Sequence, residues 1–118
     1  MQLPLDLSKI STKYGEIIAN IEVIRIGTTQ KIRIMLKDAS YLDFWFSETG
    51  RYSYHWERRH MDGKIFRFDN APHHVNISTF PHHFHNGREN NVVESSLSRM
   101  PEEAISQVLD FVQEFLKQ

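Results

Sequence analysis

The sequence predicts an α+β fold, in which an antiparallel meander sheet of five or six strands carries a C-terminal helix packed on one face. Between residues 16 and 68, runs rich in β-branched and aromatic residues alternate with short turn-forming stretches, which is the pattern of consecutive strands. After Pro101 the apolar residues recur at intervals of three and four, as they do along one side of a helix. Such a helix must bury its apolar side, and the sheet is the only apolar partner large enough.

The first two strands are expected at residues 16–26 and 31–36. β-branched residues dominate the earlier run, and the Gly-Thr-Thr-Gln stretch at residues 27–30 supplies a turn. In the second run, apolar residues alternate with polar ones such as Lys31 and Arg33. One face of this strand is therefore expected to be buried and the other to face water.

Three further strands are expected at residues 41–46, 51–58 and 64–68. Asp62-Gly63 is a strong short-range hairpin signal, and it joins the last two of these strands. The resulting order is a meander, in which each strand pairs with the next one along the chain.

The remaining segments carry weaker patterns. The histidine-rich stretch after residue 68 is expected to form a short strand between two loops, and Val92-Val93 a brief edge strand. Residues 1–14 are expected to be irregular or to form one short turn, because Pro4 disfavours the helical conformation at Leu3.

The single expected helix begins at Pro101, a residue type that suits the first helical position. Glu102 and Glu103 follow, where their negative charge is favourable at the positive N-terminal end of a helix. The expected apolar face consists of Ala104, Ile105, Val108, Leu109, Val112, Phe115 and Leu116.

Length and composition limit the classes of function. The 118 residues are expected to form one domain, 1–118. Fourteen Lys and Arg against fifteen Asp and Glu leave a net charge of -1, so any contact with nucleic acid must use a local patch. The chain has no cysteine, which excludes disulfides and thiolate nucleophiles and leaves a zinc site to histidines and carboxylates. With no basic leader and no long apolar run, a cytoplasmic protein without membrane contact is expected.

Histidines are concentrated in one part of the chain, because five of the seven lie between residues 67 and 85. Two Pro-His-His triplets stand there nine residues apart, and a His-x-His pair, His83 and His85, closes the second. Side chains alternate along an extended segment, so His83 and His85 are expected on the same face. Since imidazole titrates near neutral pH and binds metals, the cluster suits proton transfer, metal binding or charge sensing.

These residue types meet the requirements of metal-free RNA cleavage. His83 and His85 are the candidates for general acid and base, Asp69 for orienting an imidazole, and Arg67 for holding a phosphate. Tyr54, on the neighbouring hairpin strand, is a second candidate that would donate a proton or stack on a base. No cofactor is needed for this chemistry. The candidates for substrate contact are Tyr52, Asn70, His73, His74 and His82.

Two other functional interpretations stay open. A divalent metal would take His83 and His85 as two ligands and a third from His73, His74 or Asp69, with a position left for water. A binding module without catalysis would use the same segment to recognise a partner or to sense pH, because clustered imidazoles gain charge together as pH falls.

Structural interpretations compete with these functions. The histidines would then be polar residues of a solvated loop, and Arg67 and Asp69 a surface ion pair. Tyr52, Tyr54 and Trp56 fall on one face of their strand, where packing in the core is a more common use of an aromatic row than base stacking.

Several motifs occur together in the order Tyr52-x-Tyr54, Arg67-Phe-Asp-Asn70, Ala71-Pro-His-His74 and Thr79-Phe-Pro-His-His-x-His85, followed by a short amphipathic helix. Over roughly residues 50–116, this order resembles the TumE family of toxin components from bacterial toxin-antitoxin systems. The resemblance implies a small cytosolic toxin whose partner is a cognate antitoxin, typically a helix-turn-helix protein. RNA is the expected substrate, and a homodimer is left open.

Overall fold

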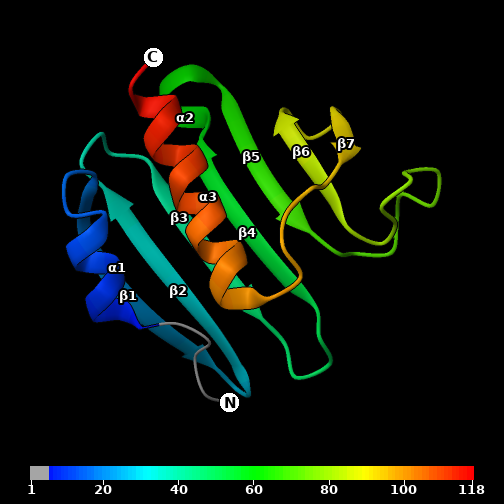
Figure 1. Ribbon diagram of the computed structural model, residues 1–118, viewed down its shortest axis with the longest axis horizontal. Helices are drawn as coiled ribbons and strands as arrows, with labels where there is room; N and C mark the ends of the chain where they lie inside the picture. Colours follow the sequence, from blue (N-terminus) through cyan, green and yellow to red (C-terminus); the bar gives the residue numbers. More distant parts are fainter. Residues whose placement is uncertain (1–5) are drawn as a thin grey trace.

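A computed structural model describes residues 6–118 and shows one sheet of seven antiparallel strands with three helices (Figure 1). The strands follow chain order across the sheet, so each pairs with its neighbour in sequence. The predicted α+β meander is confirmed with seven strands, slightly more than the five or six expected, because the end of the histidine-rich stretch and the Val92-Val93 stretch each contribute a short strand. The strands are β1 (Ile18–Ile26), β2 (Thr29–Leu36), β3 (Tyr41–Phe46), β4 (Tyr52–Arg58), β5 (Lys64–Asp69), β6 (His83–Gly87) and β7 (Val92–Glu94).

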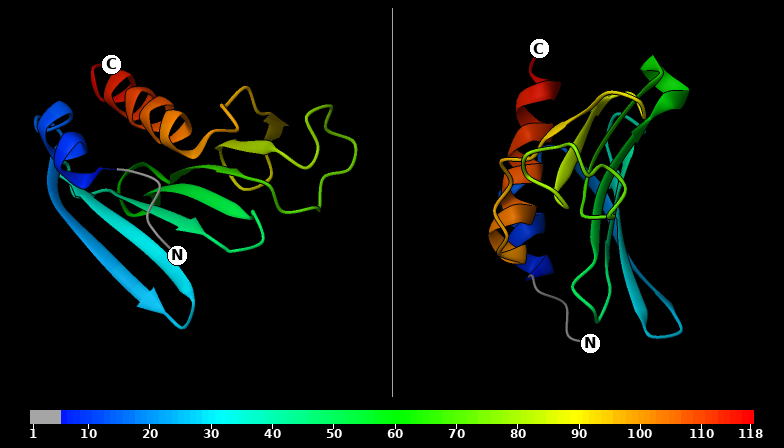
Figure 2. Two further views of the ribbon diagram at one scale, coloured as in Figure 1. Left: turned by 60° about the horizontal axis from the view of Figure 1, so that its bottom comes forward. Right: turned by 90° about the vertical axis from the view of Figure 1, so that its right-hand side faces the viewer.

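The sheet has two unlike faces. In β2, Ile32 and Ile34 are fully buried, whereas Lys31 and Arg33 beside them are half-buried on the opposite side. The buried face lies beneath the helices, and the opposite face is not covered by any helix of residues 6–118 (Figure 2). The alternation that predicted a half-buried sheet is therefore confirmed, and the uncovered side is called the open face below.

The C-terminal helix α3 (Pro101–Leu116) begins where the sequence predicts and lies across the buried face. Its expected apolar side is buried from Ala104 to Val112 and half-buried at Phe115 and Leu116, and its aromatic residues pack on those of the sheet. Phe115 meets Trp56 edge-on with 5.1 Å between ring centroids, and Phe111 meets Phe66 in the same way at 5.2 Å. Within residues 6–118, no helix has both the length and the apolar composition needed to cross a membrane.

The N-terminal segment forms a helix, α1 (Leu7–Lys13), so the expectation of an irregular stretch or a single turn is wrong for these residues. The side chain of Asp6 caps the helix by accepting from the backbone amides of Ser8 and Lys9, which satisfies donors that a helix start otherwise leaves free. Tyr14, just after the helix, donates to Asp110 of α3 at 2.7 Å. The effect expected of Pro4 on Leu3 lies outside the described residues.

The connection between β4 and β5 differs in form from the expected hairpin turn. The two strands pair antiparallel, as the Asp62-Gly63 signal predicts. They are joined by one helical turn, α2 (Arg59–Asp62), which ends at Gly63 in the left-handed conformation with φ of 77°. Glycine adopts that conformation without the steric cost of a side chain.

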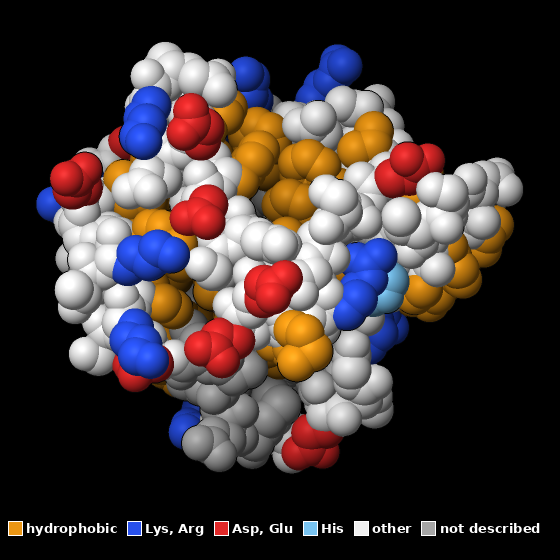
Figure 3. Space-filling view, viewed as in Figure 1, with side chains coloured by type: hydrophobic (Ala, Val, Ile, Leu, Met, Phe, Trp, Pro, Cys, Tyr) orange, Lys and Arg blue, Asp and Glu red, His pale blue; other side chains and the backbone are white. Residues whose placement is uncertain are grey.

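Hydrophobic side chains also reach the surface on the helix side of the molecule, between α3 and the end of the sheet near β6 (Figure 3). Phe66, Phe111 and Phe115 line a hollow of about 540 Å³ there, with Lys64 and Arg88 at its edge. This hollow lies on the opposite side of the sheet from the histidine cluster described below.

The packing of α3 on the sheet gives the first testable prediction. Leu109 has no solvent exposure, so Leu109→Ala should remove buried methyl groups and leave a cavity, lowering the free energy of unfolding by about 2–5 kcal/mol. Urea unfolding followed by circular dichroism would measure it. Glu114→Ala, on the exposed side of the same helix, should stay within about 0.5 kcal/mol of wild type. Equal stability of both variants would contradict the assigned packing.

Candidate active site

Strand pairing brings the expected acid-base residues together on the open face. Asp69 at the end of β5 stands opposite His83 of β6, and Arg67 stands opposite His85. Since alternate residues of a strand share a face, all four side chains lie on one side of the sheet. The shared face of His83 and His85 is as the sequence predicts, and the register of β5 against β6 adds the carboxylate.

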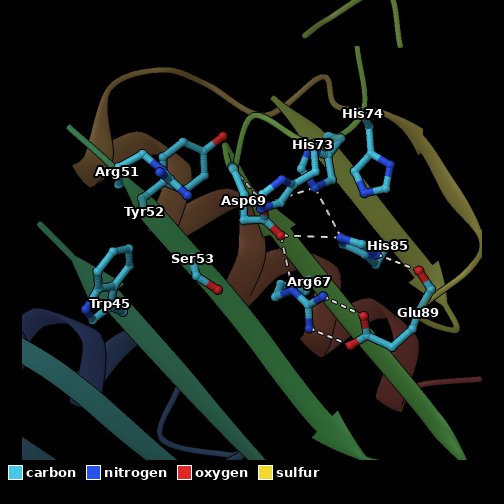
Figure 4. Close-up of a pocket in the computed structure, with 12 residues that line it drawn as sticks. Trp45, Arg51, Tyr52, Ser53, Arg67, Asp69, His73, His74, His85 and Glu89 are labelled. Carbon is cyan, nitrogen blue, oxygen red and sulfur yellow. Dashed lines mark hydrogen bonds and ion pairs between the residues drawn. The ribbon is translucent and has the colours of Figure 1, made fainter. Parts of the chain in front are cut away.

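His83, His85 and Asp69 form a buried cluster, in which Asp69 and His85 face each other (Figure 4). The Nε2 atoms of the two imidazoles are 3.1 Å apart. Nε2 of His83 is 2.9 Å from Oδ1 of Asp69, and Nε2 of His85 is 3.4 Å from Oδ2. His83 is 2% and His85 5% exposed, so water has little access to these contacts.

Backbone carbonyls fix the orientation of both rings. Nδ1 of His83 lies 3.0 Å from the carbonyl oxygen of Pro81, and Nδ1 of His85 lies 2.8 Å from that of Glu89. A carbonyl only accepts, so we assign the hydrogen of each neutral ring to Nδ1. Both Nε2 atoms then present lone pairs toward Asp69. Acceptors that converge in this way repel one another unless a cation, either a proton or a metal ion, lies between them.

The environments of the two imidazoles shift their pKa values in opposite directions. Burial lowers the pKa of His83, although the Pro81 carbonyl and Asp69 favour its charged form. The hydrogen bond to Asp69 raises the pKa of His85, against the effect of burial. Burial alone would raise the pKa of Asp69, but the hydrogen bonds from His85 and the Ala71 amide help to hold it at about 2. A proton taken up by the two rings is therefore favoured on His85 over His83, beside a carboxylate that stays charged.

Arg67 does not have the free guanidinium that the sequence-based phosphate role requires. It makes two parallel hydrogen bonds to Glu89, both of 2.7 Å, and its Nε donates to Asp69 at 3.1 Å. The bidentate arrangement is among the stronger charge-assisted contacts. Arg67 therefore positions the cluster from one side in this structure, and its charge is already balanced by carboxylates.

His74 approaches the cluster from the loop between β5 and β6. Its ring centroid is 4.6 Å from that of His83 and 5.7 Å from that of His85. One nitrogen from each of these three rings lies within 4.8 Å of the others, so the three histidines could together hold a metal ion. His73 also borders the cluster and is exposed. Of the third ligands considered from sequence, His74 and Asp69 are the best placed.

Other residues expected from sequence do not belong to the cluster itself. Tyr54 is in the core with 3% exposure, where it contacts Phe44 edge-on and burial raises its pKa, so it cannot reach the cluster from the opposite face of the sheet. Tyr52 borders the same hollow as the cluster, and its hydroxyl lies 2.9 Å from Nδ1 of His82. Asn70 links two loops by accepting from the Tyr52 amide and donating to a backbone carbonyl, which is a structural role.

The cluster forms one end of a hollow of about 430 Å³ on the open face. Three of the residues that line it, Trp45, Arg51 and Ser53, were not singled out from the sequence (Figure 4). The alternation of β3 and β4 does place residues 45 and 53 on the polar face. Their proximity to the histidines follows from strand register, which the chain does not reveal locally.

Comparison with known proteins identifies a family. The family model described as "Toxin TumE" matches residues 10–116, which is nearly the whole chain and includes every residue of the cluster. No curated protein and no solved structure matches.

Proposed function

Because this chain belongs to the TumE toxin family, we propose that its toxic activity is the cleavage of RNA at the cluster of His83, His85 and Asp69. A toxin family also implies a cognate antitoxin as partner. The observation that carries the proposal is the convergence of two buried imidazoles, with opposite pKa shifts, on one carboxylate in a hollow. Pairs of titratable groups whose pKa values are pushed apart are typical of acid-base sites.

The two imidazoles act as one acid-base unit. Because their Nε2 atoms are only 3.1 Å apart, a proton taken up by one ring is shared with the other and held by Asp69. In the reaction, the ribose 2′-oxygen attacks phosphorus and gives its proton to a base. The bond from phosphorus to the 5′-oxygen breaks, and that oxygen takes a proton from an acid. The products are a 2′,3′-cyclic phosphate and a 5′-hydroxyl.

The second acid-base role falls to another group. In an in-line displacement the attacking and leaving oxygens stand on opposite sides of phosphorus, which two nitrogens 3.1 Å apart cannot serve separately. His74 is the nearest further imidazole, half-buried and facing the same hollow. His74→Ala is therefore expected to reduce cleavage without disturbing the pairing of β5 and β6.

The pH dependence of cleavage gives a further prediction. The acid-base unit of His83 and His85 is active while it holds one proton. It gains a second as pH falls through the lowered pKa of His83, and it loses its proton as pH rises through the raised pKa of His85. The rate should follow a bell whose limbs lie on either side of about pH 6.5, with apparent pKa values that belong to the pair. Cleavage of a short RNA at pH 4.5–9 would show it, and a rate that rises steadily with pH would contradict it.

The second candidate chemistry is metal-assisted cleavage at the same residues, and His74 is the observation that favours it. Three imidazole nitrogens converge there, and the Nδ1 hydrogens of His83 and His85 are held by carbonyls, as is usual for metal-binding histidines. A bound divalent ion would polarise a phosphoryl oxygen. Three imidazole nitrogens match zinc or another imidazole-binding metal in both the number and the type of ligands.

Two experiments separate the chemistries. Elemental analysis of protein purified without a histidine tag, followed by RNA cleavage with and without a chelator, tests for a required metal. Attack by the 2′-oxygen leaves cyclic phosphate ends and spares DNA. Metal-free protein with full activity and cyclic ends would support proton transfer, whereas loss of activity on chelation and recovery with a divalent ion would support the metal.

We also propose that the antitoxin is a helix-turn-helix protein that neutralises the toxin by direct binding. The support is membership of the toxin family. Co-expression with the adjacent open reading frame should restore growth and yield a complex on size exclusion. Restored growth without a complex would contradict direct binding.

A further inference from the structure

We infer that the hollow beside the histidine cluster is a nucleotide subsite for single-stranded RNA, in which a base stacks on Trp45 and a phosphate is held by Arg51. This inference rests on the proposed RNA cleavage and adds the residues that recognise the substrate. It holds whether the cluster carries a proton or a metal ion.

The subsite lies in line with the cluster across four strands. Trp45 of β3 stands opposite Ser53 of β4, Ser53 opposite Asp69 of β5, and Asp69 opposite His83 of β6. Adjacent strands are about 4.8 Å apart, so Trp45 lies roughly 14 Å from His83 along this row. Ser53 has a small side chain between them, and the space above it forms part of the hollow. The volume of about 430 Å³ lies in the range of sites for small molecules.

The two tryptophans of the chain have different environments. Trp56 is 1% exposed and packs against the aromatic residues of α3. Trp45 is half-buried on the open face and lines the hollow, and within residues 6–118 no aromatic ring is stacked on it. An indole in a concave, partly dry position is a suitable surface for a flat base.

Arg51 supplies a cation whose charge is not balanced by a neighbour. Among the described residues 6–118 it forms no ion pair, and its buried Nε has no hydrogen-bond partner. The other arginine of the hollow, Arg67, is held by Glu89 and Asp69. An anion that enters the hollow would therefore be attracted by Arg51. Asp69 and Glu89, the two carboxylates that line the hollow, already have a cationic partner in Arg67.

An aromatic surface, an unpaired guanidinium and a reactive cluster in one hollow match the parts of a nucleotide. The base would stack on Trp45, and its phosphate would contact Arg51. The linkage to be cut would then lie at the histidines. A base stacked in a duplex cannot enter such a hollow, whereas an unpaired base in a single strand or loop can. Single-stranded RNA is therefore the substrate class that fits.

Binding of a short single-stranded oligodeoxynucleotide tests the subsite apart from catalysis, because it lacks the 2′-hydroxyl. Fluorescence anisotropy of a labelled strand would give the affinity. Trp45→Leu should weaken binding roughly 5- to 140-fold, the range expected for loss of one base-stacking contact. Arg51→Gln should weaken binding about 10- to 100-fold and make the slope of log K against log salt shallower by about 0.7, as expected for one lost phosphate contact.

Two further variants complete the design. Ser53→Leu should weaken binding by filling the hollow without removing a contact group. Lys9→Gln, an exposed cation on α1 and so on the helix-covered side of the sheet, away from the hollow, should leave both affinity and salt slope unchanged. Circular dichroism and thermal unfolding of each variant would confirm that it is folded.

The outcomes separate this inference from the proposed cleavage. Weaker binding in the Trp45 and Arg51 variants supports the subsite, even if wild type leaves RNA uncut and the cleavage proposal fails. Unchanged binding in both variants overturns the subsite, even if RNA is cut. Equal affinity for the same sequence as a duplex, or no binding by wild type, also overturns it.

Discussion

His85→Ala is expected to reduce RNA cleavage by about 10²- to 10⁴-fold, the range typical of a lost acid-base group. The hydrogen bond to Asp69 raises the pKa of His85, so this imidazole is the favoured carrier of the proton of the cluster. His83→Ala should have an effect of similar size, because it removes the other half of the acid-base unit. Cleavage of total RNA by purified protein and growth arrest on expression would measure both effects, and toxicity should disappear in each variant.

The matched control is His60→Ala. His60 is exposed and lies 2.9 Å from the carbonyl oxygen of Ala39, far in the fold from the cluster, so its loss should leave cleavage and growth arrest unchanged. Circular dichroism would check that the sheet and α3 persist in each protein. Growth arrest that survives replacement of both His83 and His85 would favour a binding module without catalysis. Harmless expression of wild type would count against a toxic activity.

Much of the fold could be predicted because its signals are local. The strands of the meander alternate polar and apolar residues, and the apolar spacing after Pro101 specifies one side of α3. The helix α1 was missed because it is short and has only Ile10 buried, so it lacks a repeated apolar pattern. Its position depends on a distant contact, from Tyr14 to Asp110, which no local pattern reveals.

The site was predicted only as far as side-chain alternation allows. His83 and His85 share a face for that reason, and Asp69 joins them through the register of β5 and β6. The partner of Arg67 could not be foreseen, since Glu89 comes from a separate turn 22 residues later. Tyr54 was named as a candidate for the chemistry but faces the core, as the competing interpretation of its aromatic row predicts.

Asp69→Ala is expected to be the most destabilising change in the cluster. Asp69 is 6% exposed and accepts hydrogen bonds from Arg67 and the Ala71 amide, besides its contacts with the two imidazoles. Removing one partner of a buried ion pair leaves the other charge without compensation, at a cost of about 3–5 kcal/mol in the free energy of unfolding near pH 5. Glu48→Ala, an exposed carboxylate in a turn, should change stability by less than about 0.5 kcal/mol.

The pH dependence of the stability difference between wild type and the Asp69→Ala variant tests whether the charge of Asp69 causes it. The pKa of Asp69 falls from 3.8 to about 2 on folding, so its contribution is present above about pH 4 and is lost as pH falls toward 2, a change of about 2 kcal/mol. The raised pKa of His85 acts in the opposite direction, since its contribution is present below about pH 6.5 and is lost as pH rises through the folded value. The free energy of unfolding of wild type should therefore exceed that of the Asp69→Ala variant by the largest amount between about pH 4 and 6.5. Urea unfolding at pH 3, 5 and 8 would measure it, and a difference that stays constant across these values would show that the charge of Asp69 is not its cause.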